Sequence, residues 1–303
     1  MNDLMEHLTN SKVKQNLTIM TEVRQSTRNL LFSKGFNEID TPILMPRTGE
    51  RYNSTFDVLL DGSKAMLADS PQIFKMLLSK AGYEKYFQFA HCFRSISNEN
   101  NLHTRLSEFI QLDIELQNTN LDDLIKLAES LISKICMILH KTLKISRMQG
   151  ITCRSRYGQE MRPDLRESED EISLVIIKNM PLTNDGKIPC HHIFAMPSDF
   201  DSIHAVENLT ELTTESFDIV MNGIEIGGGD MRINDCNTQT EMMKLFNVDE
   251  KRYAGYLEIL NAGNINHNGG FSIGLERMVM ALSHSENIRQ VTAFPDYYRR
   301  GVN

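Results

Sequence analysis

Residues 217–229 read Phe-Asp-Ile-Val-Met-Asn-Gly-Ile-Glu-Ile-Gly-Gly-Gly and contain their own turn. Asn222-Gly223 is the strongest short signal for a β-hairpin, because both residues tolerate positive φ angles. We therefore expect two antiparallel strands that leave this turn in register. The expected opposite pairs are Met221 with Ile224, Val220 with Glu225, and Ile219 with Ile226.

Two carboxylates converge if this hairpin forms. Asp218 shares a sheet face with Val220, which lies opposite Glu225, so the backbones of the two acids are diagonal neighbours roughly 7–8 Å apart. In an unbroken strand, their separation of seven positions would place them on opposite faces. Like charges this close repel unless a cation lies between them, and carboxylate oxygens suit Mg²⁺ carried by a nucleotide. Two acids on a solvated face are the alternative.

The glycines that follow, Gly227 to Gly229, indicate a bulge or a place where a ligand approaches the backbone closely. Arg232 lies just beyond them. Its guanidinium could bind a carboxylate through two parallel hydrogen bonds, although an isolated arginine in a strand is more often a surface residue. Both interpretations of Arg232 stay open on these residues alone.

A second glycine-rich segment begins at Asn268 and changes to an apolar helical pattern at Gly274. Arg277 then lies in the first helical turn, where free N–H groups and the helix dipole favour anions. A fixed positive charge there suits a terminal phosphate. An ion pair with Glu276 or another acid is the alternative, because glycines before a helix are a weak signal by themselves.

The remaining periodicities predict an α+β fold, a mostly antiparallel sheet flanked by helices. Tyr86–Arg94 and Glu108–Leu116 alternate and are joined by a polar loop, which predicts a long antiparallel hairpin. Leu17–Ser33 predicts a helix that ends near Gly35. Apolar residues at helical spacing predict a second, amphipathic helix through Leu124, Ala128, Leu131, Ile135 and Ile138.

Composition narrows the class of protein. The 303 residues carry 32 Lys+Arg against 40 Asp+Glu, so the formal net charge is −8 and the pI is near 5.6. That balance disfavours broad nonspecific binding of nucleic acid but not a local basic patch. The sequence has no apolar run of the roughly 18–20 residues that cross a membrane, no secretory pattern at its start and no CxxC pair among its five cysteines. We expect a cytoplasmic protein with one domain over residues 1–303.

Taken together, these segments resemble the class II aminoacyl-tRNA synthetases, and in particular the catalytic core of the bacterial-type aspartyl enzymes. The resemblance runs from about Leu17 to the end of the chain. The segment around Pro42 resembles the motif that forms the family's dimer interface, which implies a homodimer. The stretches that carry the resemblance are Phe36–Leu44, Ser70–Lys75, Cys92–Arg94 with Ser107–Asp113, Arg156–Arg166, Cys190–Pro197 and Gly274–Arg277.

The resemblance implies a site with two ends, one of which binds ATP and Mg²⁺. It places Arg94 on the α-phosphate and Arg277 on the γ-phosphate, and it makes both arginines catalytic. Asp218 and Glu225 match the family's metal-binding acids. The residues implied to bind ATP are Arg94, His191, His192, Glu225, Gly274 and Arg277.

The other end is implied to bind the amino acid. Lys75 and Arg232 match the two cations that bind the side-chain carboxylate of aspartate, and an amide there would leave buried positive charge unpaired. We therefore expect aspartate or a close analogue, with aspartate preferred over asparagine. Asp113 is implied to lie near the substrate's amino group. The residues implied to bind the substrate are Glu50, Gln72, Lys75, Asp113 and Arg232.

Three departures separate the chain from that family pattern. The resemblance begins within the first twenty residues, so we expect no anticodon-reading domain. Arg166 is followed closely by the strand expected at Ile172–Ile177, so we expect the bacterial insertion domain to be absent as well. The acid of the second motif is replaced by Ile96 in a longer loop, and the sequence leaves open whether Glu99 substitutes for it.

These observations predict that ATP and Mg²⁺ activate aspartate or a close analogue, through its α- or β-carboxylate, to an acyl-adenylate. Acyl transfer to ammonia or another small amine would follow, as in an asparagine synthetase of archaeal type that the chain resembles in domain content. The first alternative is an aspartyl ligase for a tRNA or tRNA-like acceptor, which the missing tRNA-reading elements disfavour. The second is a noncatalytic sensor of amino acid or ATP, against which the retained arginines and acids argue.

Overall fold

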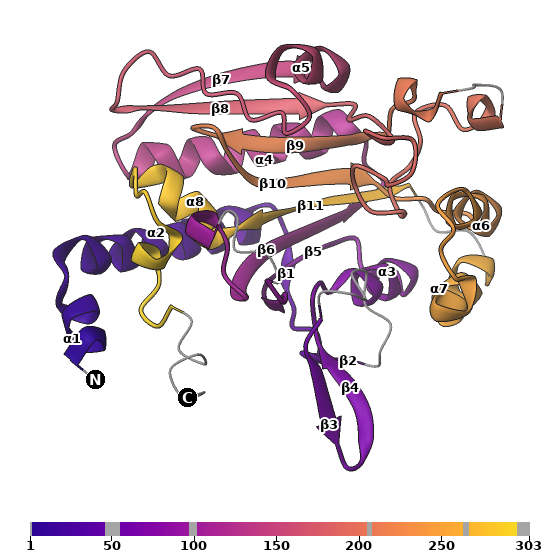
Figure 1. The fold of residues 1–303 in the computed structure, drawn as a ribbon, viewed down its shortest axis with the longest axis horizontal. Coiled ribbons are helices and arrows are strands. Elements are labelled where there is room, and N and C mark those ends of the chain that lie inside the picture. The colour runs from indigo at the N-terminus through magenta and orange to yellow at the C-terminus, as the bar shows by residue number, and fades with distance from the viewer. Residues whose placement is uncertain (1, 46–54, 97–101, 205–207, 263–266, 296–303) are drawn as a thin grey trace.

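Eight strands form the large sheet of the computed structural model, which describes residues 2–45, 55–96, 102–204, 208–262 and 267–295 (Figure 1). The first and last neighbouring pairs of this sheet are parallel, and the pairs between them are antiparallel. The predicted α+β class is therefore confirmed. In sheet order the strands are β1 (Asn37–Glu38), β5 (Lys85–Phe93), β6 (Glu108–Gln117), β11 (Asn268–Gly274), β10 (Ile224–Met231), β9 (Ser216–Met221), β8 (Glu171–Lys178) and β7 (Thr142–Gln149).

A smaller antiparallel sheet extends away from the large one (Figure 1). It consists of β2 (Leu44–Met45), β4 (Ser63–Leu67) and β3 (Asp57–Leu60), in that order. The apolar side chain of Leu59 on β3 is 80% exposed, so part of this sheet is not covered by the rest of the chain.

Helices α2, α4 and α8 pack on one face of the large sheet and share its main apolar core. None of the described helices is both long enough and apolar enough to cross a membrane. The α-helices are α1 (Asn2–Thr9), α2 (Ser11–Ser33), α3 (Gln72–Lys80), α4 (Leu121–Ile138), α5 (Gly150–Tyr157), α6 (Cys236–Leu245), α7 (Ala254–Asn261) and α8 (Leu275–Leu282). Short 3₁₀ helices are η2 (Leu102–Thr104), η3 (Asp201–His204), η4 (Leu209–Glu211), η5 (Glu250–Tyr253) and η6 (Ile288–Val291).

Local capping explains where the predicted helices begin and end. The side chain of Asn10 accepts hydrogen bonds from the backbone N–H groups of Lys12 and Val13, so α2 begins at Ser11, earlier than the sequence predicted. It ends before Gly35, whose φ of 80° is the left-handed conformation that glycine adopts freely. Asn120 caps α4 in the same way as Asn10 caps α2.

Alternation along the strands separates an apolar face of the sheet from a polar one. On β6, Leu112 and Ile114 lie in the core beneath the helices, whereas Asp113 and Glu115 point to the opposite face. The predicted hairpin of β5 and β6 is confirmed. The polar face is where the charged residues of the sequence prediction gather.

The hairpin of β9 and β10 turns at Asn222-Gly223 as predicted, but its register changes after two pairs. Val220 lies opposite Glu225, and Ile219 lies opposite Gly227 rather than Ile226, because a bulge interrupts β10 between Glu225 and Gly227. The predicted pairing of Ile219 with Ile226 was therefore wrong. A bulge adds one residue to a strand, so the residues beyond it change faces relative to those before it.

Glu276 lies in the first turn of α8 and is almost completely buried. Both oxygens of its carboxyl group are 3.1 Å from the backbone nitrogen of Ile110, which donates to them. Burial nevertheless raises the pKa of Glu276 to about 7 from its ordinary 4.5. The folded chain therefore keeps a proton that the unfolded chain releases, and stability falls as the pH rises from about 4.5 to 7.

We expect the substitution Glu276→Gln to remove this penalty. The free energy of unfolding of the variant should exceed that of the wild type by up to roughly 3 kcal/mol at pH 8. The reason is that glutamine has no buried carboxyl group whose raised pKa destabilises the folded chain. At pH 4.5 or below, where the carboxyl group is protonated in the folded chain and at least half protonated in the unfolded chain, the difference should be small. Urea denaturation at pH 4.5 and pH 8 measures both values, and a difference independent of pH would contradict the assignment.

Candidate active site

Two cross-strand rows of residues on the polar face of the sheet form the candidate site. Neighbouring strands lie about 4.8 Å apart, so a row that crosses four strands is roughly 14 Å long. The first row consists of Glu115, Gly270 and Asp230. The second consists of Asp113, Ser272, Gly228 and Asp218.

Glycines form the floor of both rows because side chains would not fit there. A Cβ atom on Gly270 would lie 2.4 Å from the carboxyl carbon of Glu115. A Cβ atom on Gly228 would lie 2.7 Å from the carbonyl oxygen of Phe217 and 2.9 Å from Oδ1 of Asp218. The acids therefore occupy space that only glycine leaves open.

Helix α3 buries a mainly polar face against this floor. Gln72, Lys75, Met76 and Ser79 recur at helical spacing and are all buried. The hydroxyl group of Tyr86 on β5 donates to the carbonyl oxygen of Lys75 at 2.5 Å and lies 2.9 Å from the hydroxyl group of Ser79. Because buried polar side chains need partners, Gln72 and Lys75 must pair with polar groups of the sheet or of a ligand.

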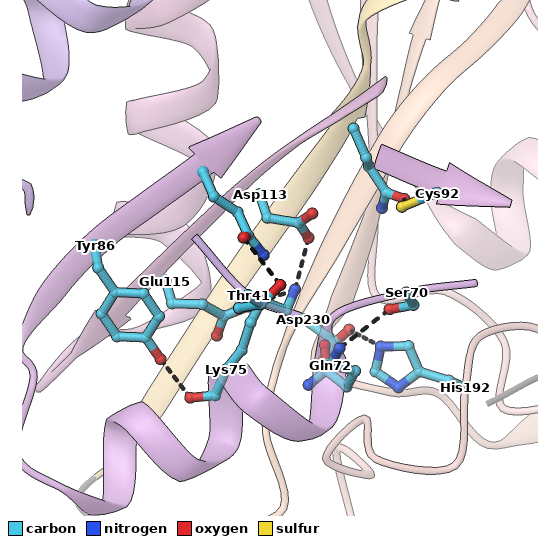
Figure 2. Close-up of polar contacts among 12 residues, drawn as sticks. Thr41, Ser70, Gln72, Lys75, Tyr86, Cys92, Asp113, Glu115, His192 and Asp230 are labelled. Carbon is cyan, nitrogen blue, oxygen red and sulfur yellow. Dashed lines mark hydrogen bonds and ion pairs between the residues drawn. The ribbon is translucent and has the colours of Figure 1, made fainter. Parts of the chain in front are cut away.

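Lys75 pairs with an acid from each row in a buried ion-pair network, and Figure 2 shows its contact with Asp113. The Nζ atom of Lys75 lies 2.8 Å from Oδ1 of Asp113 and 2.9 Å from Oε1 of Glu115. The guanidinium of Arg232 lies 2.6 Å from Oε1 of Glu115 and 2.6 Å from Oδ1 of Asp230. The five side chains are at most 5% exposed. Both cations that the sequence assigned to the substrate thus already contact carboxylates of the chain.

The ion pairs change the pKa values of this network in a consistent direction. Burial alone would lower the pKa of Lys75, but the charges of Asp113 and Glu115 outweigh it and raise that pKa. Burial would raise the pKa of Glu115, but Arg232 and Lys75 outweigh it and lower it. For Asp113 burial prevails over Lys75, and its pKa is raised. Asp113 is therefore the least compensated of these carboxylates.

His192 extends the network beyond Asp230. Its Nε2 atom lies 3.1 Å from Oδ2 of Asp230 (Figure 2). The same atom lies 3.1 Å from the guanidinium of Arg232. Burial would raise the pKa of Asp230, but the charges of Arg232 and His192 outweigh it and hold that pKa well below its usual range. His192 accordingly lies at the amino-acid end of the site rather than beside the acid pair.

At the other end of the second row, Asp218 and Glu225 converge on one cation. The guanidinium of Arg162 contacts the carboxylate of Glu225 and lies 3.7 Å from Oδ2 of Asp218. His191 lies 3.2 Å from Oδ1 of Asp218. Burial would lower the pKa of His191, but its hydrogen bond to Asp218 and that carboxylate's charge outweigh burial and raise it. The hairpin therefore brings the two acids together, around a guanidinium.

Arg277 lies beside this acid pair, in the first turn of α8 after Gly274. Its guanidinium donates to the carbonyl oxygens of Thr104, at 3.1 Å, and Glu225, at 3.0 Å. Burial lowers the pKa of Arg277, and three neighbouring guanidiniums lower it further. Those neighbours are Arg105, Arg162 and Arg94.

Arg94 follows β5 and is held from two sides. Its guanidinium donates to the carbonyl oxygen of Asp69 at 3.2 and 3.3 Å and lies over the ring of Phe109, 5.0 Å from its centre. Arg94, Arg105 and Arg162 thus all lie close enough to Arg277 for their positive charges to lower its pKa. Such a concentration of like charge suits an anion with several charges, such as a polyphosphate.

Several site residues escaped the sequence prediction. The sequence analysis assigned no role to Arg162 or Arg105, because no periodicity indicates that either lies in the site. Asp230 and Glu115 were also missed, although both are acids in strands next to predicted site residues. Glu50, and Glu99 as a substitute for the second-motif acid, lie outside the described residues.

The described residues contain no group of three or more His, Cys, Asp or Glu side chains placed to hold a metal ion. Two carboxylates are nevertheless what Mg²⁺ usually takes from a protein when substrate phosphates and water supply its other ligands. The guanidinium of Arg162 between Asp218 and Glu225 indicates that the pair accommodates a cation. The donor set therefore fits a magnesium ion carried by a nucleotide.

Known proteins similar to this chain include several tRNA ligases. The aspartate–tRNA(Asp/Asn) ligase of Sulfurovum sp. is 24% identical over an alignment of 430 residues that covers 95% of this chain and 72% of the relative. Cytoplasmic aspartate–tRNA ligase 1 of Arabidopsis thaliana is 28% identical, over 91% of this chain and 56% of the relative. The first alignment is longer than the 303-residue chain, so the Sulfurovum ligase contains residues within the aligned region that this chain lacks.

The fold has solved counterparts. Asparaginyl-tRNA synthetase from Pyrococcus horikoshii, complexed with asparaginyl-adenylate, superposes with a TM-score of 0.79 over 96% of this chain and 70% of that chain, at 19% identity. A family model described as tRNA synthetases class II (D, K and N) matches residues 2–297. The chain therefore belongs to the class II tRNA synthetases of the D, K and N type, a family of ATP-dependent amino-acid-activating ligases.

Proposed function

We propose that the chain uses ATP and Mg²⁺ to activate the carboxylate of aspartate or a close analogue, and that it then transfers the acyl group to ammonia or another small amine. The observation that carries this proposal is the polarity of the site. At one end of the glycine floor, Arg162 and Arg277 contact Glu225, and the charges of Arg94 and Arg105 act on Arg277. At the other end lies a buried network rich in carboxylates. A triphosphate and an amino acid lying side by side complement these two ends.

The chemistry needs no nucleophile from the enzyme. A carboxylate oxygen of the amino acid attacks the α-phosphorus of ATP, the bond to the bridging oxygen breaks, and pyrophosphate leaves with the bonding electrons. The charge that develops on the phosphate oxygens would be stabilised by Arg94 and Arg277, which backbone carbonyls already hold in place. An amine then attacks the activated carbonyl carbon, and AMP leaves.

Asp218 and Glu225 are the residues that would hold Mg²⁺. Bound with ATP, the ion would neutralise phosphate charge. Arg162, which now contacts both acids, would then be released toward the phosphates. His191 would keep Asp218 oriented through its hydrogen bond.

The hypotheses differ in the acyl acceptor that each predicts. Ile96 in place of the second-motif acid favours a small amine. The names of the relatives, which are aspartate–tRNA ligases, favour a tRNA or tRNA-like acceptor as the second candidate. A noncatalytic sensor is the third, and the paired acids and four arginines argue against it.

We further propose a cytoplasmic homodimer formed through the region near Pro42. Ile43 and Leu44 are 45% and 47% exposed although apolar, and the neighbouring β3 exposes Leu59 as well. Exposed apolar side chains that cluster in this way are typical of a protein interface.

Amino-acid-dependent exchange of pyrophosphate into ATP tests the activation step. The wild type should catalyse this exchange with aspartate or an analogue, and Arg277→Met should lower kcat by roughly 10²-fold, because it removes charge that stabilises the transition state. Arg147→Met is the matched control, since Arg147 pairs with Glu129 on the exposed edge of the sheet. Intact ATP binding without exchange for any amino acid would support the sensor instead.

Binding of Mn²⁺ as a probe for Mg²⁺ tests the acid pair without any turnover. Arg162→Met should bind Mn²⁺ roughly tenfold more tightly than the wild type in the absence of ATP, because the competing guanidinium is gone. Arg166→Met is the control, since Arg166 pairs with Asp164 instead. Free Mn²⁺ is measured by electron paramagnetic resonance, and equal affinities would show that these acids do not hold the ion.

Product analysis distinguishes the acceptors. After activation with labelled amino acid, the addition of ammonia or hydroxylamine should release free amide or hydroxamate, detected by mass spectrometry, with stoichiometric AMP. Added tRNA should remain unlabelled. Label on tRNA without amine-dependent product would instead establish the tRNA ligase.

A further inference from the structure

The amino-acid end of the site contains more negative than positive charge. Three carboxylates, those of Asp113, Glu115 and Asp230, share the two fixed cations Lys75 and Arg232. The network is buried, so water compensates little of the remaining charge. These five side chains together carry a net charge of −1.

Asp230 is the acid that creates this excess. It directly follows the glycines of β10, and the bulge before them turns it to the polar face, where it lies across Gly270 from Glu115. Its Oδ1 atom is 2.6 Å from Arg232, and its Oδ2 atom is 3.1 Å from His192. Asp230 thus occupies the guanidinium that the family resemblance reserves for the side-chain carboxylate of the substrate.

The polar atoms left over show what the pocket can still accept. Among the described residues, Oδ2 of Asp113 and Oε2 of Glu115 are buried and have no hydrogen-bond partner. Both are acceptors on carboxylates, so they require N–H or O–H donors from a ligand. Buried donors without a partner are also present, at Nε2 of Gln72 and Nε of Arg232. A ligand group that both donates and accepts hydrogen bonds can pair with acceptors and donors among these atoms. A second carboxylate can only accept hydrogen bonds, so it leaves the two carboxylate oxygens without donors.

Charge leads to the same conclusion. The α-ammonium group of an amino acid would bring the network from −1 to neutral, and an uncharged side chain would leave it there. The side-chain carboxylate of aspartate would add a fourth buried acid to two cations. The raised pKa of Asp113 agrees with an existing excess of negative charge.

We propose that Asp230 determines the specificity of this pocket: by occupying Arg232, it excludes a substrate with a second carboxylate and selects one with a carboxamide side chain, as in asparagine. This inference rests on the proposed activation of aspartate or a close analogue, and it reverses the order of preference that the two cations alone suggested. A carboxamide substrate has one carboxylate, so it is the α-carboxylate that is activated.

The test compares asparagine with aspartate by pyrophosphate exchange and by calorimetric binding, in wild type and in Asp230→Asn. The wild type should favour asparagine at least about tenfold in kcat/KM and in affinity, as expected for a pocket that discriminates by paired polar groups. Asp230→Asn removes one negative charge with little change of shape, so the ratio should move at least about tenfold toward aspartate. Asp61→Asn is the control, because Asp61 is exposed in the turn of β3 and β4.

The outcomes separate this inference from the proposed function. Preference of the wild type for aspartate, or an unchanged ratio in Asp230→Asn, would overturn the role of Asp230 while leaving activation intact. Exchange with no amino acid would overturn the proposed activation, and the two binding constants would still decide whether Asp230 selects the carboxamide. Should Asp230→Asn fail to fold, the ratio in the wild type decides the matter, since it needs no variant.

Discussion

A single extra residue in β10 determines which side chains of that strand reach the active site. Up to Glu225 the strand keeps the register set by its turn. Beyond the bulge, each residue lies on the opposite face of the sheet from the one it would occupy without the extra residue. Asp230 and Arg232 consequently meet Glu115 on the polar face, while Met231 enters the apolar core. Without the bulge, two charged side chains would face that core, where no partner could compensate them.

The two ends of the site hold opposite excesses of charge. Three carboxylates outnumber two cations at the amino-acid end. At the other end, Arg162 and Arg277 contact Glu225, and the charges of Arg94 and Arg105 add to theirs. Each excess is costly in the absence of a ligand, because like charges repel and burial weakens their solvation. A ligand with an ammonium group at one end and phosphates at the other relieves both, which is the charge distribution of an aminoacyl-adenylate in formation.

The short connection between α5 and β8 has a direct part in this arrangement. It carries Arg162 to Asp218 and Glu225, so a segment that resembles a surface connection supplies the cation between the two acids. Arg166, four residues later, pairs with Asp164 and lies near His284 instead. The spacing within this connection therefore separates an arginine of the site from one that is structural.

The sequence by itself determined the elements and the hairpins. The Asn222-Gly223 turn, the alternation of β5 and β6, and the amphipathic pattern of α4 are local signals, and the structure confirms each. The convergence of Asp218 and Glu225 followed from one turn. Only the tertiary structure decided which cation lies between those acids and which acids surround Lys75, because these contacts join segments far apart in the chain. It also decided the bulge, since a glycine run permits a change of register but does not say where it occurs.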